Sequence, residues 1–262
     1  MVSGPARAQP ERVLRRPAAN WHNRRMATDG DVIAITGAST GIGAETARRA
    51  VADGYRVVLA ARSEDKLEAL ASELGGAEKA LAVRCDVCEW PDNERLVSEA
   101  LEAFGRIDAV FANAGFGAKR GFLEETPEQW RSMVLTNVLG VAYTIRATLP
   151  HLLERGTGHY VITSSVAGRR ALPGSMYSAT KWAVTATGEA LRQELRQVHS
   201  NRRIRVTLIE PGMVDTPFFD ERPGPDNALH DDDIARAVLF ALDQPEHVDV
   251  NEILIRPTQQ PT

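Results

Sequence analysis

Tyr177 and Lys181 stand four residues apart in the run Tyr-Ser-Ala-Thr-Lys. In a helix, this spacing puts both side chains on one face, one turn apart. A phenol can give or take a proton, and a neighbouring ammonium favours its ionised form. The pair is therefore a candidate acid/base centre, although either residue alone could be an ordinary helix residue satisfied by local contacts.

A glycine-rich stretch, Thr-Gly-Ala-Ser-Thr-Gly-Ile-Gly, begins at Thr36 between an apolar run and an amphipathic one. Its glycines permit a tight turn, the close approach of a pyrophosphate and close packing of a helix on a strand. The helix N-terminus that follows adds N–H groups and a partial positive charge. The stretch therefore predicts a dinucleotide site. Its candidate binding residues are Gly37, Ser39, Thr40, Gly41, Ile42 and Gly43.

The end of the second apolar run bears on the choice of cofactor. An Asp or Glu there would accept a hydrogen bond from the 2′-hydroxyl of NAD. Here Ala61 ends the run and Arg62 follows it. A guanidinium pairs with a phosphate through a bidentate fork. Arg62 therefore predicts binding of a 2′-phosphate, and hence NADP(H); the alternative is a solvated arginine at a helix start.

Two further run ends carry residues suited to a dinucleotide. The carboxylate of Asp86 closes the third run, where it could accept from an adenine amino group. Asn113-Ala-Gly closes the fourth, and small residues there let the backbone approach a cofactor. Taken alone, either could be ordinary turn chemistry. The candidate contacts from these two ends are Asp86, Val87, Asn113, Ala114 and Gly115.

Short apolar runs alternate with longer amphipathic stretches along the chain. Strands are expected over residues 31–36, 55–61, 80–85, 107–112, 159–164, 203–209 and 252–255. Helices are expected over residues 42–53, 64–74, 93–104, 127–153, 175–199 and 231–242. Consecutive apolar positions are typical of parallel strands buried on both faces. The pattern predicts an α/β fold: a single doubly wound Rossmann-type domain, with a seven-stranded parallel sheet and helices on both faces.

Bulk composition excludes several classes of protein. The 262 residues, 43% apolar and 25% charged, fit one large soluble domain. No apolar run approaches the roughly 20 residues of a membrane helix, so no membrane association is expected. The net charge is −4, and the first 30 residues carry six arginines against two acids, which leaves the rest strongly negative. A domain with this negative net charge is a poor nucleic-acid binder.

The basic stretch over residues 1–29 is expected to be a disordered extension, ahead of a domain over residues 30–258. Three prolines interrupt any amphipathic helix in it, which weakens the alternative of a transit peptide. Another alternative is an upstream start codon, with the working start at Met26.

Cys85 and Cys88 have the spacing of a redox pair or of half a metal site. No second cysteine pair accompanies them, so ordinary structural cysteines are the favoured interpretation and no metal is expected. Two cysteines cannot staple a secreted fold, which favours the cytoplasm as the compartment.

Taken in order, these motifs resemble the short-chain dehydrogenase/reductase family over about residues 31–255. The resemblance rests on the glycine-rich turn, Asp86, Asn113-Ala-Gly, Tyr177-x-x-x-Lys181 and Pro211-Gly. Each motif is weak by itself, but their occurrence together in this order is specific. The catalytic set that the resemblance implies is Asn137, Ser165, Tyr177 and Lys181.

The resemblance also implies cofactor contacts and an assembly. Pro211, Gly212 and Thr216 would flank the nicotinamide, and Tyr177 and Lys181 would contact the cofactor as well as the substrate. Family members commonly form homotetramers through the two long helices, so a homo-oligomer, either a tetramer or a dimer, is expected.

The chain departs from the family pattern at two places. The family often has a second Asn where this chain has Ala112, which should have a small effect. Its serine usually lies thirteen residues before the tyrosine, a separation that Ser164 has and Ser165 lacks. We select Ser165, because Ser165-Val-Ala-Gly matches the Ser-x-x-Gly pattern of the family.

The motifs and the resemblance together indicate an NADP(H)-dependent oxidoreductase acting on CH–OH groups. Tyr177 would exchange a proton with a small alcohol or with its aldehyde or ketone. Ser165 would orient the reacting oxygen, and Asn137 could hold a water that relays protons to Lys181. The run over residues 251–258 is similar to serine and 3-hydroxy-acid dehydrogenases and to clavulanic acid reductase, which favours a hydroxy or oxo substrate.

Several alternatives remain open at this point. A catalytically silent, dinucleotide-sensing regulator would be expected to lose the tyrosine or the lysine, and both are present. An NAD-dependent enzyme of the same fold is separated from the main hypothesis by Arg62 alone. Arg169 or Arg170 could meet a substrate carboxylate, although a solvated arginine is the more ordinary interpretation.

Overall fold

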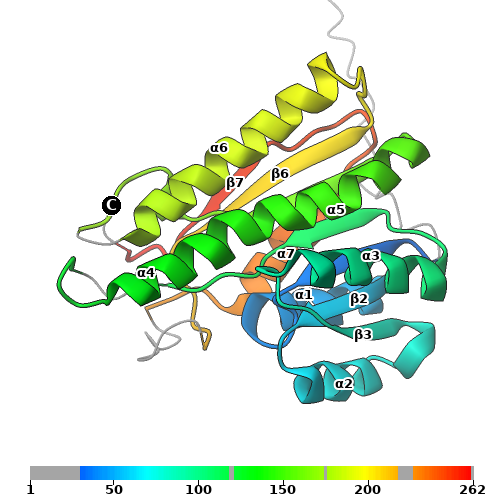
Figure 1. Cartoon of the computed structure of the whole chain (residues 1–262), viewed down its shortest axis with the longest axis horizontal. Helices are drawn as coiled ribbons and strands as arrows, with labels where there is room; N and C mark the ends of the chain where they lie inside the picture. Colours follow the sequence, from blue (N-terminus) through cyan, green and yellow to red (C-terminus); the bar gives the residue numbers. More distant parts are fainter. Residues whose placement is uncertain (1–29, 118–120, 174–175, 218–226, 261–262) are drawn as a thin grey trace, which may run out of the picture.

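A seven-stranded parallel sheet forms the centre of the computed structural model, which describes residues 30–117, 121–173, 176–217 and 227–260 (Figure 1). The strand order is β3-β2-β1-β4-β5-β6-β7. The strands are β1 (Val32–Thr36), β2 (Arg56–Ala61), β3 (Ala80–Arg84), β4 (Ala109–Ala112), β5 (Gly158–Thr163), β6 (Ile204–Pro211) and β7 (Glu252–Ile255). The expected α/β fold with a doubly wound, seven-stranded parallel sheet is confirmed.

Helices cover both faces of this sheet (Figure 1). Helices α3 (Trp90–Phe104), α5 (Gly140–Arg155) and α6 (Met176–Gln197) pack on one face. Helices α1 (Gly41–Ala52), α2 (Glu64–Glu73) and α7 (Asp231–Leu242) pack on the other. Short turns of 3-10 helix, η1 (Gly76–Glu78) and η3 (Val166–Gly168), complete the helical segments together with α4 (Pro127–Val134) and η2 (Leu135–Leu139).

The consecutive apolar residues of each strand supply both halves of the core. On β1, Val32 and Ala34 face α3, α5 and α6, whereas Ile33 and Ile35 face α1, α2 and α7. All four side chains are fully buried. This explains why the strands lack the polar alternation of a sheet with one wet face.

The order of the strands reverses between β1 and β4, which are neighbours in the sheet although two strands separate them in sequence. In doubly wound sheets, ligands bind in the crevice outside the carboxyl ends of the strands at this point. The glycine-rich turn follows β1 and the Asn113-Ala-Gly run follows β4, so the fold places both of them at that crevice.

The prediction of one continuous helix over residues 127–153 is wrong. The chain forms α4, then one turn of π-helix over Leu135–Leu139, then α5. In that turn the Gly140 N–H donates to the Leu135 carbonyl, five residues back. A single extra residue in a helix of 3.6-residue period shifts the later side chains around the axis, and such turns often occur at functional sites.

Other boundaries differ from expectation by one to three residues. Helix α3 begins at Trp90 rather than at residue 93. Pro91 fits its first turn, because the backbone N–H that proline lacks would have no acceptor within the helix at that position. Strand β6 runs on to Pro211, which pairs with Ile255 of β7. Residues 218–226 lie outside the described part, and after them Leu229 pairs with Val214.

Within the described residues, no helix is long and apolar enough to cross a membrane. Cys85 is buried and Cys88 half-buried, both are free thiols, and burial raises the pKa of each. The same described residues contain no cluster of three His, Cys, Asp or Glu side chains that could hold a metal ion. The predicted extension over residues 1–29 lies outside the described residues.

Candidate active site

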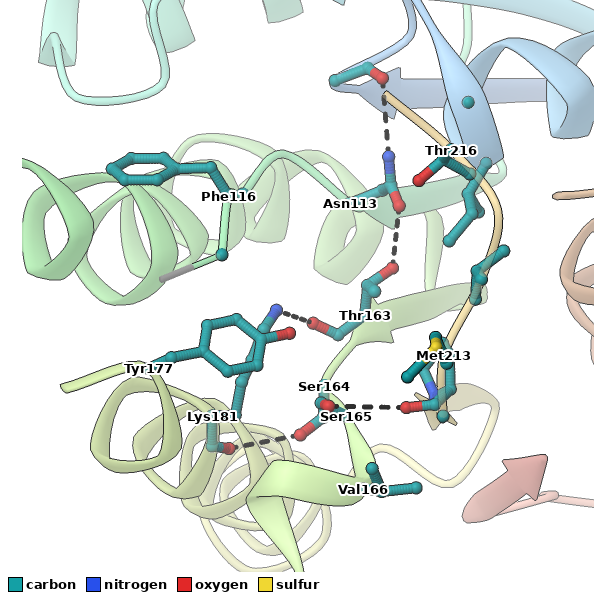
Figure 2. Close-up of a pocket in the computed structure, with 18 of the residues that line it drawn as sticks. Asn113, Phe116, Thr163, Ser164, Ser165, Val166, Tyr177, Lys181, Met213 and Thr216 are labelled. Carbon is teal, nitrogen blue, oxygen red and sulfur yellow. Dashed lines mark hydrogen bonds between the residues drawn. The ribbon is translucent and has the colours of Figure 1, made fainter. Parts of the chain in front are cut away.

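A cavity of about 320 Å³ opens at the carboxyl ends of the strands, where the order of the sheet reverses. The glycine-rich turn, the segment after β4, the end of β5 and helix α6 all contribute to its wall. Figure 2 shows Tyr177 and Lys181 on one side of it and Met213 and Thr216 on the other. The cavity therefore brings together the glycine-rich turn and the Tyr177/Lys181 pair, which lie more than 130 residues apart in the sequence.

The glycine-rich turn has room for an anion but none for side chains. A Cβ atom on Gly43 would overlap the Gly37 carbonyl, and one on Gly37 would lie 2.9 Å from the Ala114 Cα. Gly41 has a φ of +55°, a left-handed value that favours glycine. Thr40 gives α1 no side-chain cap, and no acidic residue stands in its first turn. Free N–H groups and the absence of carboxylates suit a pyrophosphate.

Hydrogen bonds join the ends of three neighbouring strands beneath the cavity (Figure 2). The Asn113 amide donates to the Thr36 carbonyl at 3.2 Å, and its oxygen accepts from the Thr163 hydroxyl at 3.0 Å. The Thr36 hydroxyl accepts from the N–H groups of Asn113 and Ala114. We call these residues, Thr36, Asn113 and Thr163, the strand-end network. It holds the floor of the cavity in place from β1 to β5.

Helix α6 presents Tyr177 and Lys181 toward this floor, as their spacing predicts. The Lys181 ammonium lies 5.7 Å from the centroid of the Tyr177 ring and donates to the Thr163 carbonyl at 2.8 Å. Burial lowers the pKa of Lys181 to about 8 and raises the pKa of Tyr177 to about 12. With this raised pKa, the Tyr177 phenol keeps its proton at neutral pH. Burial therefore outweighs the lowering of the pKa that was expected from the Lys181 ammonium.

The two candidate serines point in different directions. The Ser164 hydroxyl is bonded to the Lys181 carbonyl at 3.2 Å and to the Thr185 hydroxyl at 2.8 Å, inside the packing of α6. The Ser165 hydroxyl donates to the Pro211 carbonyl at 3.4 Å and lies on the cavity wall beside Tyr177, where it lowers the pKa of the phenol against the larger effect of burial. Of the two serines, Ser165 is therefore the one whose hydroxyl interacts with the Tyr177 phenol.

Asn137 lies in the π-helical turn and is almost fully buried. Its side-chain oxygen accepts from the Phe116 N–H at 3.0 Å, and its amide donates to the Phe116 carbonyl at 2.9 Å and to the Thr180 hydroxyl at 3.2 Å. These bonds fix the segment after β4 against α6. Because the side chain is engaged in this way, it holds the cavity wall, and the water relay expected of Asn137 stays a prediction.

Most of the predicted cofactor residues line the cavity. They are Gly37, Thr40, Gly41, Ile42, Asn113, Ala114, Gly115, Tyr177, Lys181, Pro211, Gly212 and Thr216. Thr216 packs on the glycine-rich turn, since a Cβ on Gly41 would lie 3.2 Å from the Thr216 Cβ. This contact brings the segment after β6 against the start of α1.

Five of the predicted cofactor residues lie outside the cavity wall: Ser39, Gly43, Arg62, Asp86 and Val87. Arg62 and Asp86 follow β2 and β3, on the far side of β1 from Tyr177. Asp86 accepts from the Cys88 N–H at 3.0 Å, so its carboxylate organises the turn. The Val87 side chain packs into the core, where a Cβ on Gly140 would come within 2.6 Å of it. Only the backbone of Val87 is suited to meet a cofactor.

Two features of the wall were not expected from the sequence. The Gln260 side chain, near the end of the chain, lines the cavity, and no local pattern marks it. Thr163 also lines it, and its position at the end of an expected strand is a signal that could have identified it. Arg169 is exposed, but its guanidinium is paired with Glu210 at 2.7 Å and with Glu252, so it is not free for a substrate carboxylate.

The parallel sheet, the glycine-rich turn at its switch point and the cavity beside it define a dinucleotide-binding α/β oxidoreductase. The family model described as short chain dehydrogenase matches residues 31–226, and the chain belongs to this family. An uncharacterized oxidoreductase of Listeria monocytogenes is 37% identical over 249 residues, which cover 90% of this chain and all of that protein.

Three solved structures are similar to the fold. An alcohol dehydrogenase from Thermococcus sibiricus, complexed with 5-hydroxy-NADP, has a TM-score of 0.81 and 36% identity, covering 89% of this chain and 99% of that one. Serine dehydrogenase from Escherichia coli has a TM-score of 0.78 and 30% identity, covering 88% and 100%. A 3-ketoacyl-(acyl-carrier-protein) reductase from Brucella melitensis, complexed with NADH, has the same TM-score and identity, covering 86% and 96%.

Proposed function

We propose that this protein is an NADP(H)-dependent oxidoreductase that interconverts a small alcohol and its aldehyde or ketone. The observation that carries the proposal is that the hydroxyls of Ser165 and Tyr177 share a cavity with the glycine-rich turn. A proton donor and a dinucleotide-binding turn on one cavity are the two requirements of carbonyl reduction by hydride transfer.

The described residues fit a nicotinamide dinucleotide. The uncapped start of α1 and its glycines would hold the pyrophosphate, while Pro211, Gly212 and Thr216 would border the nicotinamide end. When bound, the cofactor supplies or accepts the hydride. The backbone of the segment after β4 completes this side of the wall, because Asn137 fixes it from below.

Tyr177 would give a proton to the carbonyl oxygen of the substrate during reduction and take it back during oxidation. Its high pKa keeps the phenol protonated at neutral pH, in the form needed for donation. Ser165 would orient the same oxygen through its hydroxyl. Lys181, held by the Thr163 carbonyl, would stabilise negative charge on the phenolate after the proton has left.

Arg62 supports the choice of NADP(H) over NAD(H). The arginine is exposed directly after β2, and Ala60 and Ala61 end that strand without a carboxylate. A 2′-phosphate would find a bidentate partner there, whereas a free 2′-hydroxyl would find no acceptor. The similar structures include one complexed with 5-hydroxy-NADP and one complexed with NADH, and the ratio of kcat/KM for NADPH and NADH is the direct test of this preference.

The proposal is tested by mixing the purified protein with NADPH or NADH and a panel of aldehydes and ketones, and following cofactor oxidation. We expect turnover with NADPH, lost in Tyr177→Phe. If NADPH binds with micromolar affinity but no carbonyl or alcohol is turned over, the alternative of a dinucleotide-sensing regulator is correct. Equal kcat/KM with both cofactors would contradict the NADP(H) preference alone.

We further propose a cytoplasmic homo-oligomer, a tetramer or a dimer, formed through α4, α5 and α6. Val134 on α4 and Trp182 on α6 are large apolar side chains that are 38% and 49% exposed. A shared interface would cover such residues. Light scattering at micromolar concentration should report two or four copies, and a monomer would contradict the assembly. The domain over residues 30–258 should fold and act without residues 1–25.

A further inference from the structure

Gln260 reaches the cavity because the chain folds back after the last strand. Its N–H donates to the Pro257 carbonyl at 3.0 Å, which closes a turn beyond β7. The Gly212 N–H donates to the Ile255 carbonyl at 2.7 Å and holds the start of that turn against the end of β6. The half-buried Gln260 side chain then forms part of the same cavity wall as Ser165 and Tyr177.

The orientation of the Gln260 amide is fixed by the backbone. Its oxygen accepts from the Met213 N–H at 2.9 Å. Since a backbone N–H can only donate, the oxygen must face Met213, and the NH2 group must face another direction. Gly212 makes this approach possible, because a Cβ there would overlap the Gln260 oxygen. Among the described residues, the NH2 group has no hydrogen-bond acceptor.

The surroundings make this donor unusual. Phe116, Val166, Leu172 and Met213 make the neighbouring wall largely apolar. Polar side chains of the floor are engaged with one another in the strand-end network, and the Lys181 ammonium is bound to Thr163. Arg169, which could have met a carboxylate, is taken by Glu210 and Glu252. Gln260 thus presents a fixed donor at the cavity, to which no described residue supplies an acceptor.

We infer that Gln260 is a specificity-determining residue, which donates to a second oxygen on the substrate, beyond the carbonyl that is reduced. The favoured substrates are therefore small carbonyl compounds with a further oxygen function, such as oxo acids and hydroxy ketones, and the corresponding alcohols. A site built to hydrogen-bond such a group discriminates against an analogue that lacks it, because its polar group is then left unpaired. This inference rests on the proposed oxidoreductase function.

The test compares carbonyl compounds in pairs: succinic semialdehyde with butanal, and 4-methoxy-2-butanone, whose ether oxygen can only accept, with 2-butanone. We expect the unchanged protein to favour the oxygenated member of each pair at least tenfold in kcat/KM. Gln260→Glu keeps an acceptor for the Met213 N–H but replaces the donor. It should raise the KM of the oxygenated members at least tenfold and change kcat/KM of butanal and 2-butanone less than twofold.

Gln259→Glu is the matched control, because it places the same charge on the exposed neighbour in the same turn. The uncharged pair of 4-methoxy-2-butanone and 2-butanone separates loss of the donor from charge repulsion of an acid. If the preference is absent in the unchanged protein, or persists in Gln260→Glu, the inference is wrong, while Tyr177-dependent reduction of any carbonyl would leave the proposed function standing. If no carbonyl compound is reduced at all, both are overturned.

Discussion

The Lys181 ammonium donates to the Thr163 carbonyl at 2.8 Å, so the end of β5 holds the charged end of a side chain from α6. Figure 2 shows this bond directly beside the Tyr177 ring. The side chain of Lys181 is only 4% exposed, and burial lowers its pKa to about 8. The position of the ammonium is therefore fixed at a cost in stability that depends on pH.

The first prediction concerns that dependence. An unfolded lysine has a pKa of about 10.4. Between about pH 8 and pH 10 the unfolded chain therefore binds this proton more fully than the folded chain, so the contribution of Lys181 to the free energy of unfolding should rise with pH. Lys181→Met should remove this contribution. The difference between the two proteins in urea unfolding at pH 7.5, 8.5 and 9.5 measures it, because the thiols of Cys85 and Cys88, whose raised pKa values act in the opposite direction, are common to both. If the free energy of unfolding changed with pH in the same way in the unchanged protein and in Lys181→Met, the prediction would be wrong.

The second prediction is that Tyr177→Phe abolishes turnover without disturbing the fold. The variant keeps the ring and its packing but removes the exchangeable proton. Turnover should fall at least a hundredfold, while the affinity for NADPH, measured by fluorescence titration, changes little. Tyr143→Phe makes the same chemical change on α5, where the ring packs against Trp90, and should leave turnover unchanged. Near-normal turnover in Tyr177→Phe would assign the proton to another group.

The third prediction concerns the exposed guanidinium of Arg62. If it binds the 2′-phosphate, Arg62→Ala should reduce the preference for NADPH over NADH by about 1.5–3 kcal/mol, the range for a charge-assisted hydrogen bond. The ratio of kcat/KM for the two cofactors measures this. Arg146→Ala removes an exposed arginine from α5 and should leave the ratio alone. A ratio unchanged in Arg62→Ala would mean that other groups select the cofactor.

The fourth prediction concerns the buried amide of Asn137. Asn137→Ala would leave the Phe116 N–H and carbonyl without their partners. The free energy of unfolding should fall by about 2–4 kcal/mol, the cost of two unsatisfied groups, as measured by urea unfolding. Cofactor affinity should fall as well, because the segment after β4 lines the cavity.

Thr180→Ala is the comparison for Asn137→Ala. It removes one partner of the amide and leaves both bonds to Phe116 in place. Thr180→Ala should therefore lower the free energy of unfolding less than Asn137→Ala does, and it should leave the cofactor affinity unchanged. Equal effects of the two substitutions would show that Asn137 acts mainly through α6.

The expected strands and most of the helices are accurate because their signals are local. The run over residues 252–255, for example, is strand β7 with no change of boundary. The pairing of Tyr177 with Lys181 on one helix face also follows from spacing alone. The distinction between Ser165 and Ser164 depends on a finer signal, since one residue of separation decides which hydroxyl lies beside the Tyr177 phenol.

Other features depend on contacts that no local pattern encodes. The π-helical turn at Leu135–Leu139 interrupts an otherwise regular helical pattern, and it positions Asn137 to bond a segment twenty residues earlier. Gln260 reaches the cavity only because the ends of β6 and β7 are paired. Arg169 looks like a free cation in the sequence, but the fold places two carboxylates on it.

The strand-end network has a consequence for protein engineering. Its hydrogen bonds make the floor of the cavity part of the sheet itself, so a change at Thr36, Asn113 or Thr163 would alter strand packing as well as the site. Phe116, Leu172 and Met213 lie on the wall and contribute mainly side-chain volume to it. Libraries that seek a new substrate range should randomise the wall and keep the floor, since the two parts of the site tolerate change so differently.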